Sequence, residues 1–261
     1  MQTSAGALLA AGLWPGALAA ADAPAPDFAF LSMNDLHYID EKDAPFFKRA
    51  VDKLKTASPQ AKLLLILGDL VETGDAKAHA AIRDILKTAG LEMKVVIGNH
   101  DYLKDAPNDR KSYVELWPDS LNYTFDHAGW QFVALDSSDG TKFEKTAVLQ
   151  PTLDWLDGML PKLDKKRPMI LITHFPLGEK VTYRPTNAEA LLDRFKEYNL
   201  KAVFNGHFHG NTEKQRGEIL ITTGKCCAKS RDNHDGTKEK GFYACKTRDG
   251  KVIREFVQVE V

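Results

Sequence analysis

The chain has 261 residues, of which 43% are hydrophobic and 27% charged, and its formal net charge at neutral pH is −1. This is the composition of an ordinary globular protein, and the length suffices to bury a large core without disulfide or metal staples. The balanced charge argues against a protein that coats nucleic acid, because such proteins usually present a strongly basic face.

The first 21 residues differ from the rest of the chain and indicate a secretory leader. Residues 4–21 are almost all Ala, Leu and Gly without a charge, and residues 17–19 (Ala-Leu-Ala) fit a small-x-small cleavage pattern. The apolar stretch is too short for a stable membrane span. Residues 2–9 resemble the segment that follows the twin arginines of bacterial Tat leaders. No Lys or Arg precedes this segment, so we expect the natural start to lie upstream; a disordered Ala-rich tail is the alternative.

Residues 22–27 are expected to form a Pro/Ala linker and residues 28–261 a single domain. An exported chain would reside in the bacterial periplasm or outside the cell, where one of Cys226 and Cys227 could form a disulfide with Cys245. Three buried free thiols are the simpler expectation, because adjacent cysteines rarely bridge each other and the number is odd.

After the linker, the chain alternates between predicted strands and helices. Apolar runs predict buried strands, and apolar side chains at helical spacing predict amphipathic helices between them. The strands are 28–33, 63–67, 95–97, 169–173 and 202–204, and the helices begin at Asp43, Asp75, Gln150 and Asn187. The last quarter is predicted to consist of strands 219–222, 241–245 and 252–259, with a hairpin turn at Asp249-Gly250. This order favours an α/β fold with two sheets packed face to face and helices outside.

Polar residues that can bind a metal follow each of the first five strands. They are, in chain order, Asp35 and His37, Asp69 after Gly68, Gly98-Asn99-His100-Asp101, His174, and Gly206-His207-Phe208-His209. In an open α/β sheet the carboxyl ends of the strands are where ligands bind, so we expect these side chains at one rim. Oxygen and nitrogen donors without thiols suit Mn, Fe, Zn or Co, and the set is too rich in imidazole for Ca or Mg. The sequence therefore predicts a centre for two metal ions.

In this order the motifs resemble those of the calcineurin-like metallophosphoesterase family. Its pattern is D-x-H, G-D-x-x-[DE], G-N-H-[DE], a single His and G-H-x-H, and the match extends over about residues 28–210 with every motif intact. The resemblance implies a four-layer αββα sandwich, with two mixed β-sheets between outer helices. The domain looks most similar to the bacterial cyclic-nucleotide phosphodiesterases of that family.

The resemblance also implies a role for each motif residue. One metal would be held by Asp35, His37 and His209, the other by Asn99, His174 and His207, and Asp69 would bridge them. Water held between two such ions loses a proton near neutral pH and would attack phosphorus in line. His100 would protonate the leaving oxygen, and Asp101 would orient His100 and keep it charged.

Two further acidic residues receive no ligand role. Glu72 either supports a ligand or caps the next turn, and Asp136 ends the run 133–135 without a matching motif. Purple acid phosphatases carry a tyrosine ligand at the position of Glu72, and their first motif ends in glycine where this chain has His37. The resemblance therefore implies a protein without Fe(III)–tyrosinate absorption.

Two polar loops are candidates to cover the metals and contact the substrate. They are residues 105–117, with Arg110 and Lys111, and residues 225–240, where Arg231 and His234 are the candidate phosphate contacts. Solvated loop charge is the alternative explanation for any one of these side chains.

Together the motifs predict a dinuclear-metal phosphoesterase, and in the first place a phosphodiesterase acting on small diesters, cyclic nucleotides among them. A phosphomonoesterase with the same site is the second interpretation. A non-catalytic metal-binding scaffold is the alternative of another class, and the His100-Asp101 pair argues against it, because a scaffold requires no acid. The sequence reveals neither a basic groove for nucleic acid nor a stable membrane span.

Overall fold

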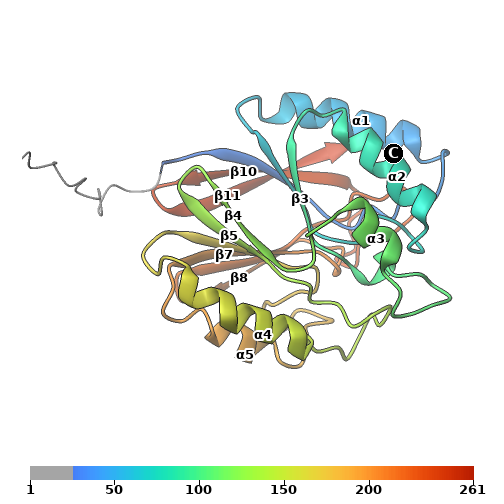
Figure 1. Ribbon diagram of the computed structural model, residues 1–261. Coiled ribbons are helices and arrows are strands. Elements are labelled where there is room, and N and C mark those ends of the chain that lie inside the picture. Colours follow the sequence, from blue (N-terminus) through green and yellow to red (C-terminus); the bar gives the residue numbers. More distant parts are fainter. Residues whose placement is uncertain (1–25) are drawn as a thin grey trace, which may run out of the picture.

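The structure is a computed structural model that describes residues 26–261. Two mixed β-sheets lie face to face between outer helices (Figure 1), which confirms the predicted four-layer sandwich. The predicted leader, residues 1–21, and most of the linker lie outside the described residues.

The first sheet contains the parallel strands that carry the first three motifs. Its order is β11-β10-β1-β2-β3, with β1, β2 and β3 parallel and with β10 and β11 as an antiparallel edge beside β1. The strand bounds are β1 Ala29–Met33, β2 Leu63–Ile66, β3 Glu92–Val95, β10 Lys240–Arg248 and β11 Lys251–Val259.

The second sheet contains the parallel strands that carry the last two motifs. Its order is β4-β5-β6-β7-β9-β8, parallel from β5 to β9 and antiparallel at both edges. The strand bounds are β4 Tyr123–His127, β5 Trp130–Ala134, β6 Met169–Ile172, β7 Leu200–Asn205, β8 Thr212–Arg216 and β9 Ile219–Thr223.

Helices cover the outer face of each sheet (Figure 1). The first sheet is covered by α1 Ala44–Ala57, α2 Ala76–Lys87 and the short α3 Lys111–Leu116, and the second by α4 Gln150–Met159 and α5 Ala188–Asp193. Two single turns of 3-10 helix are η1 Asn99–Asp101 and η2 Leu160–Lys162.

Strand β2 illustrates how each sheet is buried on both faces. Leu64 and Ile66 pack among the apolar side chains of α1 and α2, whereas Leu63 and Leu65 point into the cluster between the two sheets. Successive side chains of a strand point to opposite faces, so a strand covered on both sides reads as one continuous apolar run. This is why β1, β2, β6 and β7 could be found from apolar runs, whereas β3, Glu92–Val95, overlaps the predicted strand 95–97 only at Val95.

Of the polar residues Asp43, Asp75 and Asn187, which were predicted to begin helices, only one caps its helix with its side chain. Asp75 caps α2 by accepting a hydrogen bond from Ala78 N at 2.8 Å. Asp43 and Asn187 also precede their helices as predicted, but their side chains bond elsewhere: Asp43 accepts from Ile39 N, and Asn187 bonds the backbone of Val148 in both directions.

All three cysteines are buried and free, so the optional disulfide is not formed. Within residues 26–261 no helix combines the length and the apolar character that crossing a membrane requires.

Candidate metal centre

The motif side chains meet where the carboxyl ends of β1, β2, β3, β6 and β7 converge. Five of the predicted ligands have a positive φ between 45° and 64°: Asp35, His37, Asp69, His207 and His209. Asp and His tolerate this left-handed conformation better than most residues, although it still costs energy. The sharp turns directly after the strands thus aim these side chains back over the strand ends.

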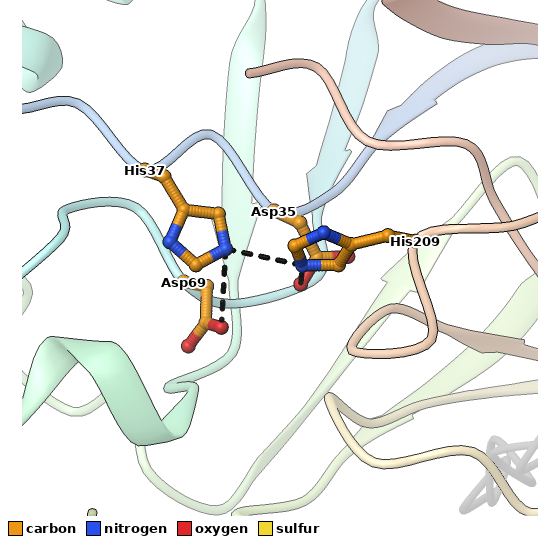
Figure 2. Close-up of side chains that lie close together, drawn as sticks. All are labelled: Asp35, His37, Asp69 and His209. Carbon is orange, nitrogen blue, oxygen red and sulfur yellow. Dashed lines mark hydrogen bonds and ion pairs between the residues drawn. The ribbon is translucent and has the colours of Figure 1, made fainter. Parts of the chain in front are cut away.

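Four of the predicted ligands form the first group (Figure 2). The two Nε2 atoms of His37 and His209 lie 3.1 Å apart, and Nε2 of His209 lies 3.2 Å from Oδ1 of Asp35. Nε2 of His37 lies 3.5 Å from Oδ2 of Asp69. All four side chains are buried, so their donor atoms converge on one small volume screened from solvent.

The second group uses the other oxygen of Asp69. Nε2 of His174 lies 3.4 Å from Oδ1 of Asp69, 3.2 Å from Nδ1 of His207 and 3.2 Å from Oδ1 of Asn99. Asp69 is therefore the residue that belongs to both groups, one oxygen to each. This is the arrangement required of a bridging carboxylate.

Each histidine of the two groups has its second ring nitrogen fixed by an oxygen acceptor. The pairs are His37 Nδ1 with Glu72 Oε2 (3.0 Å), His174 Nδ1 with the Leu67 carbonyl (2.8 Å), His207 Nε2 with the Phe143 carbonyl (2.7 Å) and His209 Nδ1 with the Asp232 carbonyl (3.3 Å). A carbonyl or carboxylate only accepts, so these nitrogens carry the proton, and in the neutral rings the inward nitrogens have their lone pairs available for a metal. Outer hydrogen bonds of this kind orient metal-binding imidazoles.

Asn34 is a supporting residue that the sequence motifs did not reveal. Its Nδ2 donates to Oδ2 of Asp35 at 2.6 Å and to the Gly224 carbonyl at 3.0 Å, and both carboxylate oxygens of Asp35 also accept from His207 N. The only sequence signal was its position next to Asp35, since its second partner lies 190 residues away.

The motif glycines leave space for the metal-binding side chains. A Cβ on Gly68, whose φ is +87°, would lie 2.5 Å from Nδ1 of His174, and one on Gly98 would overlap the carboxylate of Asp69. A Cβ on Gly206 would lie 2.9 Å from Oδ2 of Asp35. Each glycine is therefore required by a close approach and not only by the turn it occupies.

Protons on some of the histidines balance the buried carboxylates. Burial acts to raise the pKa of Asp35, but the neighbouring charge of His209 outweighs it and lowers the pKa to about 2. Burial acts to lower the pKa of His174, but Asp69 and Asp35 outweigh it and raise the pKa to about 9. Burial and the charge of His174 lower the pKa of His207 to about 3. The site thus concentrates negative charge that cations would neutralise in place of protons.

The donor set fits a pair of divalent cations. Two clusters of imidazole and carboxylate donors, each with its donor atoms within 4.8 Å of one another, share a single carboxylate. Buried charges require such compensation, and borderline metals prefer this mixture of nitrogen and oxygen donors. Which residue holds which metal stays a prediction.

His100 lies at the edge of this centre with its ring partly exposed in the cavity. Its backbone N–H donates to Oδ1 of Asp69 at 2.8 Å, and its Nδ1 lies 2.8 Å from the Glu72 carbonyl. That carbonyl can only accept, so Nδ1 carries a proton and Nε2 is left for a substrate. The position suits the predicted acid.

The predicted role of Asp101 is wrong. Its fully buried carboxylate accepts hydrogen bonds from the backbone N–H groups of Leu70, Val71 and Gly98 at 2.8–3.2 Å. These bonds hold the turn after β2 against the turn after β3, while the His100 ring is oriented by Glu72. Asp101 is therefore a structural residue, and adjacency in the motif misled because η1 points the two side chains in different directions.

Glu72 supports the metal centre and does not belong to it. It accepts from His37 Nδ1 and is paired with Arg231, whose Nε lies 3.0 Å from Oε2. His37, Glu72 and His100 also approach one another closely enough to suggest a third metal group. The guanidinium already neutralises the carboxylate, so a third cation is disfavoured there.

A cavity of about 550 Å³ opens above the two groups. Besides the motif residues it is lined by Thr73, Tyr102, Lys104, Thr141, Phe143, Tyr183, Arg231 and His234. The two predicted substrate contacts, Arg231 and His234, thus lie in the lining, and their role stays a prediction.

The expectation for the loop 105–117 is wrong. None of these residues belongs to the cavity lining: Arg110 pairs with Asp136 at 2.5 Å, and Lys111 begins α3. The cavity lining contains instead three residues that no sequence motif indicated: Thr141, Phe143 and Tyr183.

A model of the calcineurin-like phosphoesterase family matches residues 28–211. A 3′,5′-cyclic-nucleotide phosphodiesterase of Nostoc sp. is 26% identical over 180 residues, which is 66% of this chain and 65% of the relative. The serine/threonine-protein phosphatase CPPED1 of Rattus norvegicus is 26% identical over 209 residues, 72% of this chain and 66% of the relative. The chain thus spans slightly less than two thirds of the length of these curated relatives.

Among solved structures, the purple acid phosphatase PPD1 from yellow lupin (Lupinus luteus) superimposes with a TM-score of 0.66. The superposition covers 90% of this chain and 52% of the phosphatase at 12% identity, so the likeness concerns the fold alone.

Proposed function

Because the chain belongs to the calcineurin-like phosphoesterase family of hydrolases, we propose that it is a metal-dependent phosphodiesterase acting on small diesters. The observation that carries the proposal is the shared carboxylate of Asp69, which lies 3.5 Å from His37 Nε2 and 3.4 Å from His174 Nε2. Two divalent cations held at these groups would supply Lewis-acid activation of water and of the phosphate.

His100 would protonate the leaving oxygen. Its Nδ1 proton is held by the Glu72 carbonyl, so an imidazolium can deliver the proton on Nε2 to the leaving oxygen. Nε2 is the nitrogen free for this transfer, and the ring lines the cavity in which the ester would lie.

The charge of the cavity favours a diester. Lys104 and Arg231 are the Lys and Arg side chains of its lining, and Arg231 is already paired with Glu72. Among the described residues Lys104 forms no ion pair, so one cationic side chain remains for the substrate. Apart from the two metal ions and the His100 imidazolium, the substrate would thus meet one free cationic side chain, which favours the monoanion of a diester over the dianion of a monoester. The name of the Nostoc relative supports cyclic nucleotides as the first substrates to examine.

The test compares kcat/KM of Mn²⁺-loaded protein on bis(p-nitrophenyl) phosphate and on p-nitrophenyl phosphate. We expect a diester preference of at least tenfold, which corresponds to about 1.4 kcal/mol of transition-state discrimination. His100→Asn serves as the control for contaminating activity. Saturable turnover that this variant abolishes would exclude a non-catalytic scaffold, and a monoester preference would overturn the diesterase proposal.

A phosphomonoesterase is the second candidate, because the Rattus relative is named a serine/threonine-protein phosphatase. The same pair of substrates decides between the two functions. A kcat/KM higher for the monoester would assign the protein to this second class without altering the metal centre.

We also propose that the protein is exported, on the basis of the uncharged apolar residues 4–21 and the small-x-small pattern at 17–19. Expression of the protein from its natural start, followed by fractionation and N-terminal sequencing, tests this. A mature chain that still begins near Gln2 would contradict it.

A further inference from the structure

Three aromatic side chains line one part of the cavity beside the two metal groups. We call Phe143, Tyr183 and His234 the aromatic wall; all three belong to the cavity lining. The ring centroids of Phe143 and Tyr183 are 6.3 Å apart, and those of Tyr183 and His234 are 5.9 Å apart, both edge to face. These neighbouring rings thus give this part of the lining an aromatic character.

Phe143 is the most exposed member of this wall. Its side chain is 56% exposed, the highest value among the large hydrophobic residues of the described chain apart from the terminal Val261. A single exposed Phe needs no explanation on an open surface, but this one faces a cavity beside the metal centre. Its own carbonyl accepts the hydrogen bond from His207 Nε2 at 2.7 Å, which fixes this part of the loop to the site.

Tyr183 is held in place at a conformational cost. Its φ is +68°, which is rare for an aromatic residue and carries strain that the surroundings must offset. The conformation places its ring edge to face with His207, with the centroids 5.2 Å apart. The strain thus keeps an aromatic face directly beside a predicted metal ligand.

From these positions we propose that the aromatic wall binds a flat aromatic ring of the substrate while the phosphate lies at the metal groups. Phe143 and Tyr183 would then be specificity-determining residues that favour esters carrying a nucleobase or aryl group over aliphatic ones. The inference rests on the proposed phosphoesterase function and concerns the substrate class of the same site. A cavity of about 550 Å³ is within the usual size range of sites for molecules as large as a nucleotide.

The test measures binding of AMP and of ribose 5-phosphate to the Mn²⁺-loaded protein by calorimetry. The two ligands share a phosphate and a sugar and differ in the aromatic ring. We expect AMP to bind at least tenfold more tightly than ribose 5-phosphate. In Phe143→Ala this ratio should fall at least fivefold, in keeping with the usual contribution of a base stacked on an aromatic side chain.

Two further variants separate stacking from general effects. Phe143→Trp should retain the preference for AMP because it retains an aromatic face, whereas Phe143→Leu should lose most of it. Ile253→Ala, which removes an exposed apolar side chain of β11 outside the cavity, should leave both affinities unchanged.

Equal affinities of the wild-type protein for AMP and ribose 5-phosphate, or no binding of either, would overturn the inference. The inference would also be overturned if Phe143→Ala lowered the affinities for AMP and for ribose 5-phosphate by the same factor. Failure of the phosphodiesterase proposal gives a different result, because the protein would then fail to hydrolyse diesters while still binding AMP in preference to ribose 5-phosphate.

Discussion

Arg231 and Glu72, which are 159 positions apart in the chain, form an ion pair at the edge of the metal centre. Nε of Arg231 donates to Oε2 of Glu72 at 3.0 Å, and the same oxygen accepts from Nδ1 of His37 at 3.0 Å. Both partners are only partly exposed, so the carboxylate is held between the guanidinium and the imidazole. The loop that covers the cavity is thereby connected to a predicted metal ligand.

This relationship predicts that Arg231→Ala weakens one metal site more than it weakens substrate binding. Without the guanidinium, Glu72 is free to rotate away from His37, and loss of such outer contacts typically lowers metal affinity about 10- to 100-fold. Metal titration by calorimetry, with metal content measured in parallel, should reveal one weakened site of two. Lys238→Ala, an exposed residue of the same loop, is the matched control. An unchanged metal affinity with a raised KM would return Arg231 to the role of substrate contact.

His100→Asn should retain both metals and lose turnover. The ring contributes a proton to the leaving oxygen, and general acid catalysis contributes roughly 10²- to 10⁴-fold to a rate. The measurement is kcat on the diester together with metal content by mass spectrometry. If the variant is purified without metal, His100 holds the metal centre together and is not the acid.

Gly98→Ala should disrupt the metal centre, because the added Cβ would overlap the carboxylate of Asp69. We expect lower metal content and a loss of about 1–3 kcal/mol in the free energy of unfolding, as is usual for overpacking. Gly158→Ala is the control: it lies in α4 with no atom near the new Cβ and should stabilise the protein by about 0.4–1 kcal/mol. Denaturant titrations of both variants give the comparison, and equal stabilities would contradict the predicted crowding at Gly98.

Asp101→Asn should lower the free energy of unfolding. Oδ1 accepts from the N–H groups of Leu70 and Val71, and Oδ2 accepts from the N–H group of Gly98. In the variant an NH2 group takes the place of one of these oxygens, so two hydrogen-bond donors would face each other. A buried hydrogen-bonding group left unpaired costs about 1–3 kcal/mol, which unfolding in denaturant can measure. A variant of unchanged stability whose kcat falls as far as that of His100→Asn would restore the orienting role.

Metal affinity should rise with pH in the neutral range. His174 is protonated below its pKa of about 9 in the absence of metal, and a cation can bind only the neutral imidazole. Binding therefore releases a proton, and each proton released gives an increase of about tenfold in affinity per pH unit below that pKa. Calorimetry in buffers of different ionisation enthalpy counts the protons, and an affinity independent of pH between 6 and 8 would refute this.

The sequence by itself determined the order of most elements and the inventory of the site, although it did not predict β4, β8 or α3. Apolar runs are a local property, and strands such as β2 are buried on both faces, so their composition alone marked them. The residues that end these strands are also adjacent in sequence to the elements that position them. The side chains Asp35, Asp69 and His174 could therefore be assigned to one rim before any contact was known.

Only the tertiary structure decided which side chains support that inventory. Asn34 bonds Gly224, Glu72 bonds Arg231, and Phe143 bonds His207, and each pair joins segments that are far apart in the chain. Such contacts depend on how loops dock after the two sheets have packed, and no local pattern encodes that docking. Asp101 demonstrates the limit most directly: its neighbour in sequence is His100, but a single turn of 3-10 helix directs its carboxylate to the backbone of Leu70 and Val71.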